Sequence, residues 1–284
     1  MEDALTVCDK SLCEVGNYFK DNCIEFYGPN CENPSTRLCT VTGKIFLFAH
    51  CSGNSFCKIP YDNISNLKYV DLSENYITVI EENDFERYSS VSILFLSNNN
   101  ISKIQEYSFR KLSNLTHLSL NINQIKDIPT NAFKYNKLLT ALELGTNPLI
   151  IPDKKSFLAS ESLTYLNISF CNLKTLCEET FMSLPNLSIL NLNGNPLTTI
   201  NENVFRPIHK LQTIYMNFIG YECLKAPYNE TINYFSVNNI TYEGPPVCTP
   251  DPIPVTTMQS TNSSRRLICD ISILILLLFA HCNI

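Results

Sequence analysis

A strict repeat of 24 residues constrains this sequence more than any other feature. Aliphatic residues recur at that spacing seven times, at Leu67, Val91, Leu115, Leu139, Leu163, Leu187 and Leu211. Most units then follow the pattern L-x-x-L-x-L-x-x-N-x-L, as in LSILNLNGNPL from Leu187. The alternation predicts a short strand with one apolar face, and such a strand buries that face only when neighbouring units stack on it. The sequence therefore predicts a solenoid of seven units.

Three interior columns keep the same register. The turn after each strand carries a recurring Asn, replaced by Cys171 in the fifth unit and by Ile219 in the seventh; the Asn residues are Asn75, Asn99, Asn123, Asn147 and Asn195. The return segments carry a Phe column, namely Phe85, Phe109, Phe133, Phe157, Phe181 and Phe205, and an aliphatic column, namely Ile80, Ile104, Ile128, Ile151, Leu176 and Ile200. We expect the Asn amides to satisfy turn backbone groups and the Phe rings to stack as a spine. All three columns are predicted to be structural.

These motifs resemble the leucine-rich repeat over roughly residues 31–248. The resemblance implies an α/β solenoid, a horseshoe of about seven 24-residue repeats with a parallel sheet on its concave face and disulfide caps at both ends. It is nearest in pattern to extracellular members such as Slit domains, Toll-type ectodomains and lipid-anchored adhesion proteins. We expect a Cys-rich N-terminal segment (1–30), an N-terminal cap (31–66), the repeats (67–220) and a C-terminal cap (221–248).

The chain has 13 Cys, which indicates an oxidising compartment. The resemblance implies disulfide candidates in the two caps: Cys31, Cys39, Cys51, Cys223 and Cys248. Seven Cys precede the first repeat, an odd number, so their connectivity stays open. Cys171 and Cys177 lack the spacing and the nearby His of a metal or redox site. We interpret Cys171 as a buried turn residue and Cys177 as a loop thiol or its partner.

Eight N-x-Ser/Thr sequons point to a secreted glycoprotein. They lie at Asn63, Asn100, Asn114, Asn167, Asn186, Asn229, Asn239 and Asn262. An Asn-rich repeat produces some sequons by chance, but eight together with 13 Cys favour the secretory route. Asn167 falls at a strand position expected to face the concave surface, where a glycan would obstruct the middle of that surface.

The C-terminal region predicts a stalk followed by an anchor. Residues 249–266 are rich in Pro, Thr and Ser, and residues 267–284 are apolar. Small residues before a terminal apolar tail favour a GPI signal, with attachment candidates Asn262 and Ser263. A single-pass membrane segment and a soluble secreted product are the alternatives. Because the first ten residues do not form a signal peptide, we hypothesise a leader upstream; a cytosolic tail-anchored protein is the competing interpretation.

Composition disfavours nucleic-acid binding and catalysis. Lys and Arg total 21 against 27 Asp and Glu, a net charge of −6, which opposes binding to phosphates. The four His stand outside any H-E-x-x-H motif, and no P-loop or G-x-S-x-G is present. We therefore predict no enzyme activity, cofactor or metal site, and we expect His117 to be a solvated side chain.

Function is then expected on the concave face. Exposed aromatic and aliphatic side chains supply binding energy at protein interfaces. The candidates are Tyr165, Phe170, Tyr215 and Phe218 as one group and Tyr69, Ile93 and Phe95 as another. We predict a cell-surface module that binds an extracellular protein ligand or co-receptor in adhesion, reception or immune recognition. A matrix structural protein and a non-catalytic subunit of a secreted enzyme are the alternatives.

Overall fold

The computed structural model describes residues 23–26, 37–42, 47–50, 52–53, 56–60, 66–197, 200–217 and 228–245. The chain divides into two units, residues 1–248 and 249–284, and every described residue belongs to the first.

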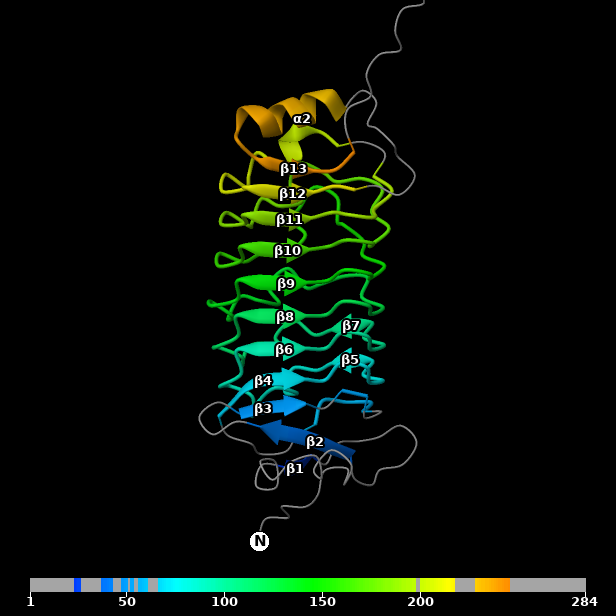
Figure 1. Cartoon of the computed structure of the whole chain (residues 1–284), viewed down its shortest axis with the longest axis vertical. Coiled ribbons are helices and arrows are strands. Elements are labelled where there is room, and N and C mark those ends of the chain that lie inside the picture. The colour runs from blue at the N-terminus through cyan, green and yellow to red at the C-terminus, as the bar shows by residue number, and fades with distance from the viewer. Residues whose placement is uncertain are drawn as a thin grey trace, which may run out of the picture. The chain divides into compact units, whose positions relative to one another are not determined.

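Seven parallel strands, one for each 24-residue unit, lie side by side along the coil (Figure 1). They are β4 (Leu67–Asp71), β6 (Ile93–Phe95), β8 (His117–Ser119), β9 (Ala141–Glu143), β10 (Tyr165–Asn167), β11 (Ile189–Asn191) and β12 (Thr213–Tyr215). Their register follows the sequence repeat, since Leu142 pairs with both Leu118 and Leu166. The predicted seven-turn solenoid is confirmed.

Three further strands precede the repeats in the same sheet. β1 (Cys23–Phe26) and β2 (Arg37–Thr42) are antiparallel, as are β2 and β3 (Leu47–His50), whereas β3 pairs in parallel with β4. β1 lies within the segment predicted for residues 1–30, and it joins the sheet through β2. Phe56 and Ile59 are buried against the first repeat, where they cover the start of the core.

α2 (Tyr228–Val237) and β13 (Thr241–Glu243) close the C-terminal end of the solenoid. β13 continues the sheet in parallel with β12. The ring of Phe235, on α2, is fully buried and lies 5.1 Å from that of Phe205, the last member of the Phe column. Apolar side chains of the last repeat, which water would otherwise reach, are thereby covered.

The return segments, opposite the strands, consist mainly of turns. Short strands β5 (Val79–Ile80) and β7 (Lys103–Ile104) pair there, and the 3-10 helix η1 (Glu202–Val204) lies in the sixth repeat. In the described part of the chain, α2 is the α-helical component of the predicted α/β fold. All six Phe of the predicted column are buried, and Phe85, Phe109 and Phe133 stack with centroid separations of 5.7 and 5.4 Å.

The recurring Asn side chains join each repeat to the one before it. Asn123 Oδ1 accepts a hydrogen bond from the Ile101 N–H at 2.9 Å, and its Nδ2 donates to the Leu96 and Leu120 carbonyls at 3.0 Å. Asn99 and Asn147 repeat this arrangement one turn away on either side. The predicted role in satisfying turn backbone groups is confirmed, and the bonds extend across repeats as well as within the turn.

Cys171 occupies the Asn position in the fifth repeat without a disulfide. It is fully buried, and Cys177 is also a free thiol. Burial raises the pKa of the Cys171 thiol to about 11, so it stays protonated at neutral pH. Because a thiol offers no carbonyl acceptor, the Leu149 N–H bonds to the Asn147 carbonyl in its own turn instead. The interpretation of Cys171 as a buried turn residue is confirmed.

Candidate binding surface on the sheet

Two columns of side chains alternate with the core residues of the strands and form the outer surface of the parallel sheet, here called the sheet face; all are half-buried except Ser119, which is 1% exposed. The third residue of each repeat supplies Tyr69, Ile93, His117, Ala141, Tyr165, Ile189 and Thr213. The fifth residue supplies Asp71, Phe95, Ser119, Glu143, Asn167, Asn191 and Tyr215. Each strand therefore presents a different pair of side chains on an otherwise regular frame.

An aromatic row crosses the first three strands of the sheet face. The Tyr69 and Phe95 rings lie 5.3 Å apart, and Phe95 lies 5.5 Å from the His117 imidazole. Strands β4, β6 and β8 hold these rings at fixed spacing, because each strand is paired in register with the next. Rigid aromatic side chains of this kind lose little conformational entropy when a partner covers them.

A hydrogen-bonded carboxylate lies next to this row. Glu143 Oε2 accepts from Ser119 Oγ at 2.9 Å and from Asn121 Nδ2, and its Oε1 is 3.4 Å from His117 Nε2. Asn121 Oδ1 in turn accepts from the Gly145 N–H at 2.7 Å, which fixes the orientation of that amide. His117 is thus a half-buried member of a polar cluster, and its expected solvation was wrong.

The cluster keeps Glu143 ionised. Its pKa is lowered from 4.5, mainly by His117 and further by Ser119 and Asn121, against the opposing effect of burial. Tyr165 lies on the next strand. Its pKa is raised mainly by burial and further by Glu143 and Tyr215. Tyr165 therefore stays neutral at pH 7, and Glu143 is the charged group beside it.

Phe170 lies outside the two strand columns. It follows β10 in a left-handed turn with φ of 54°, and its side chain is 55% exposed. Its ring lies over Gly194 of the next repeat, where an added Cβ would clash with the ring. Gly194 thus leaves the space that the Phe170 ring fills. Phe170 belongs to the edge of the sheet face, and Phe218 lies outside the described residues.

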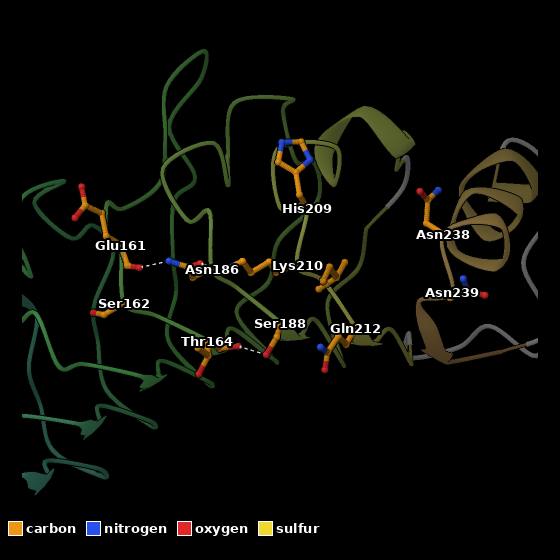
Figure 2. A pocket seen from close by; sticks show the side chains of 11 residues that line it. Glu161, Ser162, Thr164, Asn186, Ser188, His209, Lys210, Gln212, Asn238 and Asn239 are labelled. Atoms are coloured by element: carbon orange, nitrogen blue, oxygen red, sulfur yellow. Dashed lines mark hydrogen bonds between the residues drawn. The ribbon is translucent and has the colours of Figure 1, made fainter.

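A second polar surface lies where the chain approaches β10, β11 and β12. A hollow of about 470 Å³ is lined by polar side chains that include Asn186, His209, Lys210 and Asn239 (Figure 2). Asn186 Nδ2 donates to the Glu161 carbonyl, and Lys210 Nζ donates to Asn186 Oδ1 at 2.6 Å. Asn186 and Asn239 are both sequon residues, so glycans at these positions would occupy this hollow.

The predicted glycosylation and disulfide residues differ in exposure and in whether the structure describes their side chains. Asn100, Asn114, Asn229 and Asn239 are exposed, whereas Asn167 and Asn186 are half-buried. Asn167 lies on the sheet face, as its strand position predicts, and its Oδ1 accepts from the Ser169 N–H at 3.0 Å. Cys57 is disulfide-bonded. The following lie outside the described side chains: Asn63, Cys31, Cys39, Cys51, Cys223, Cys248, Asn262 and Ser263.

The chain belongs to the leucine-rich repeat family. The family model, leucine rich repeat, matches residues 58–101, 89–149 and 161–218, which together exceed half of the chain. No curated protein sequence matches it significantly. In the part of the chain that the structure describes, no helix has both the length and the apolarity needed to cross a bilayer.

Two solved structures with similar folds come from larger chains. One is a chain of the Toll–Spätzle complex, described as a molecular hub in Drosophila development and innate immunity, with 20% identity and a TM-score of 0.48 over 68% of this chain. The other is the APL1 leucine-rich repeat domain, with 24% identity and a TM-score of 0.46 over 57% of this chain. This chain spans 29% and 42% of their respective lengths.

Proposed function

We propose that this chain is a protein-recognition module that binds its partner on the sheet face. One observation carries this proposal: a regular frame holds side chains that differ from strand to strand, with the Tyr69, Phe95 and His117 row beside the ionised Glu143. Leucine-rich repeat domains commonly serve as protein-interaction modules, which supports it. Aromatic rings beside a satisfied carboxylate provide apolar contact area together with a charge that selects partners.

The partner surface follows from this chemistry. Asp71 and Glu143 are the acidic residues of the two columns, which contain no Lys or Arg. A complementary partner presents an apolar group to the Tyr69 and Phe95 rings and a basic or hydrogen-donating group near Glu143. A glycan on Asn167 would confine such a partner to strands β4–β9, because Asn167 lies on β10, between Glu143 and Tyr215 in the fifth-residue column.

The proposed setting is the cell surface, with residues 249–266 as a stalk and 267–284 as an anchor signal or membrane segment. The exposed sequon residues Asn100, Asn114, Asn229 and Asn239 and the disulfide at Cys57 support an extracellular setting. Phospholipase C treatment of cells that express the chain behind an added leader tests the anchor. Release of a protein whose mass drops on deglycosylation is expected; retention of an unglycosylated protein would contradict the setting.

Binding is tested by probing a panel of recombinant extracellular proteins with the full chain. The double variant Tyr69→Ala/Phe95→Ala is expected to lose at least tenfold in affinity for any partner found, because it removes two adjacent rings. Tyr107→Ala is the matched control, since Tyr107 is an aromatic residue of the return segments with 38% exposure. Equal losses in both variants, or in neither, would place the contact elsewhere and overturn the proposal.

A further inference from the structure

The core is less well covered beside the C-terminal cap than along the repeats. In the first six repeats the aliphatic first residue is at most 2% exposed, whereas Leu211, the first residue of the seventh, is 6% exposed. Ile240, just before β13, is 8% exposed. Leu211 lines the polar hollow that Figure 2 shows. Water therefore reaches the edge of the core through this hollow.

A sequon Asn lines the same hollow where the chain enters β13. Because Thr213 pairs with Thr241, Asn239 aligns with Leu211, two residues earlier on each strand. The repeats hold a buried aliphatic residue at this place, but Asn239 is exposed, with a left-handed φ of 55° that Asn adopts more readily than most residues. Thr241, which completes the sequon, is also exposed. The cap thus presents an acceptor for a sugar beside the least covered part of the core.

The other lining residues match the chemistry of a sugar. Thr164, Ser188 and Gln212 hold the second position of three successive repeats, and they follow one another along the hollow (Figure 2). Their hydroxyl and amide groups donate and accept hydrogen bonds, as sugar hydroxyls do. Leu211 adds an apolar contact. The volume of about 470 Å³ is within the range of about 300–1,000 Å³ that small-molecule sites have.

Asn186, the other sequon Asn of the hollow, is already held on both sides. Its Nδ2 donates to the Glu161 carbonyl, and its Oδ1 accepts from Lys210 Nζ at 2.6 Å. These bonds join the fourth, fifth and sixth repeats, and the Asn186 side chain is half-buried. Asn186 therefore belongs to the wall of the hollow, and the exposed Asn239 is the better attachment point.

We propose that this hollow holds the first sugar of an N-linked glycan on Asn239, which completes the C-terminal cap. The transfer forms a bond between Asn239 Nδ2 and C1 of the sugar, breaks the bond from C1 to the pyrophosphate of a lipid-linked oligosaccharide donor, and releases one proton from Nδ2. The proposal rests on the extracellular setting proposed above, and it is independent of the sheet face.

Covalent attachment explains how a shallow polar hollow can hold a sugar. A tethered group has a high effective concentration at its site, so contacts that are weak for a free sugar are sufficient. The bound sugar covers Leu211 and Ile240 and thereby removes apolar surface from water. We therefore expect the first sugar on Asn239 to stabilise the folded protein.

The experiment expresses the full chain behind an added leader in cells that make high-mannose glycans, and glycopeptide mass spectrometry reads the occupancy of each sequon. We expect a glycan on Asn239. Endoglycosidase H, which leaves one sugar on each Asn, should change the unfolding temperature by less than about 0.5 °C. Peptide-N-glycosidase F, which removes that sugar, should lower it by at least about 2 °C.

Matched variants separate the effect of Asn239 from that of other glycans. Thr241→Val removes the sequon, keeps a branched side chain, and should lower the unfolding temperature by at least about 2 °C. Asn229→Gln is the control, because Asn229 is an exposed sequon residue of α2 that does not line the hollow. Gln212→Ala should destabilise the glycosylated protein more than the Thr241→Val protein, since only the former has a sugar beside Gln212.

Several results would overturn the proposal. They are a bare Asn239 beside other occupied sequons, a glycan on Asn186 instead, equal losses in Thr241→Val and Asn229→Gln, and a loss that is complete after endoglycosidase H. If Thr241→Val fails to fold, the two enzyme treatments of the wild type decide. A chain without a glycan at any sequon would refute the extracellular setting together with this proposal, whereas binding on the sheet face is tested separately.

Discussion

The interior of the solenoid repeats its residue types from turn to turn, whereas the sheet face varies them. Inside, the same residue types recur every 24 positions, and Asn99, Asn123 and Asn147 make the same bonds in successive turns. On the sheet face, neighbouring strands present Phe95, Ser119 and Glu143 at one equivalent position. The regular interior therefore specifies the fold, whereas the side chains of the sheet face can vary without changing it.

Removal of a ring from the Phe column, inside the solenoid, should give the largest loss of stability. Phe109 is fully buried and stacks on both Phe85 and Phe133, so Phe109→Ala is expected to lower the free energy of unfolding by about 3–5 kcal/mol. Urea unfolding followed by circular dichroism measures it. A loss below about 1 kcal/mol would show that the column is not a main source of stability.

The Asn column offers a graded test. Asn123→Ala leaves the Ile101 N–H without a partner and should cost about 1–3 kcal/mol. The Leu96 and Leu120 carbonyls lose one donor each but keep Asn99 Nδ2 and Asn147 Nδ2, respectively. Cys171→Ala should cost less, because the Leu149 N–H is already bonded within its own turn. The same unfolding assay compares the two variants, and equal losses would refute the ladder role assigned to the Asn amides.

A smaller effect is expected where the interior meets the edge of the sheet face. Gly194→Ala should destabilise the protein by about 1–2 kcal/mol, because φ is +69° and the new Cβ would meet the Phe170 ring. The double variant Gly194→Ala/Phe170→Ala should recover part of this loss, since the ring is then absent. No recovery would mean that the backbone conformation alone requires Gly194.

Glu143 should give the smallest effect, and one that depends on pH. Its pKa in the folded protein lies below 4.5, so its contribution to stability is present above that pH and is lost as the pH falls through the folded value. The difference between wild type and Glu143→Gln should therefore shrink as the pH falls below 4.5. Glu86→Gln is the control, an exposed carboxylate of the return segments. A difference that does not vary with pH would refute the cluster.

The interior was predictable because repetition reveals it. The Leu, Phe and Asn columns recur every 24 residues, which shows which residues occupy equivalent positions. A single sequence therefore shows the residue type of each interior position several times. The sheet face has no such redundancy. The contact between His117 and Glu143 joins different columns of adjacent repeats, and no spacing in the sequence predicts it.

Two other features could have been found as departures from the pattern. Asn136 and Ser160 interrupt an apolar column at the 22nd position, which is visible in the sequence once the repeats are aligned. The sequence predicts Phe170 on the concave face together with Tyr165 and Tyr215, whereas β10 ends at Asn167 and Phe170 lies in the left-handed turn that follows. Turn geometry of this kind is set by the bonds to the next repeat, including Phe170 N–H to Asn193.

The adjacent residues Leu94 and Phe95 test the division between interior and sheet face most directly. Both lie on β6, with Leu94 fully buried and Phe95 on the sheet face. Unfolding and partner binding are measured for Leu94→Ala and Phe95→Ala. We predict a loss of about 2–5 kcal/mol in stability for Leu94→Ala. For Phe95→Ala we predict a change within about 1 kcal/mol, with at least a tenfold loss of binding. Equal destabilisation by the two substitutions, with partner binding unchanged in Phe95→Ala, would contradict the division between interior and sheet face.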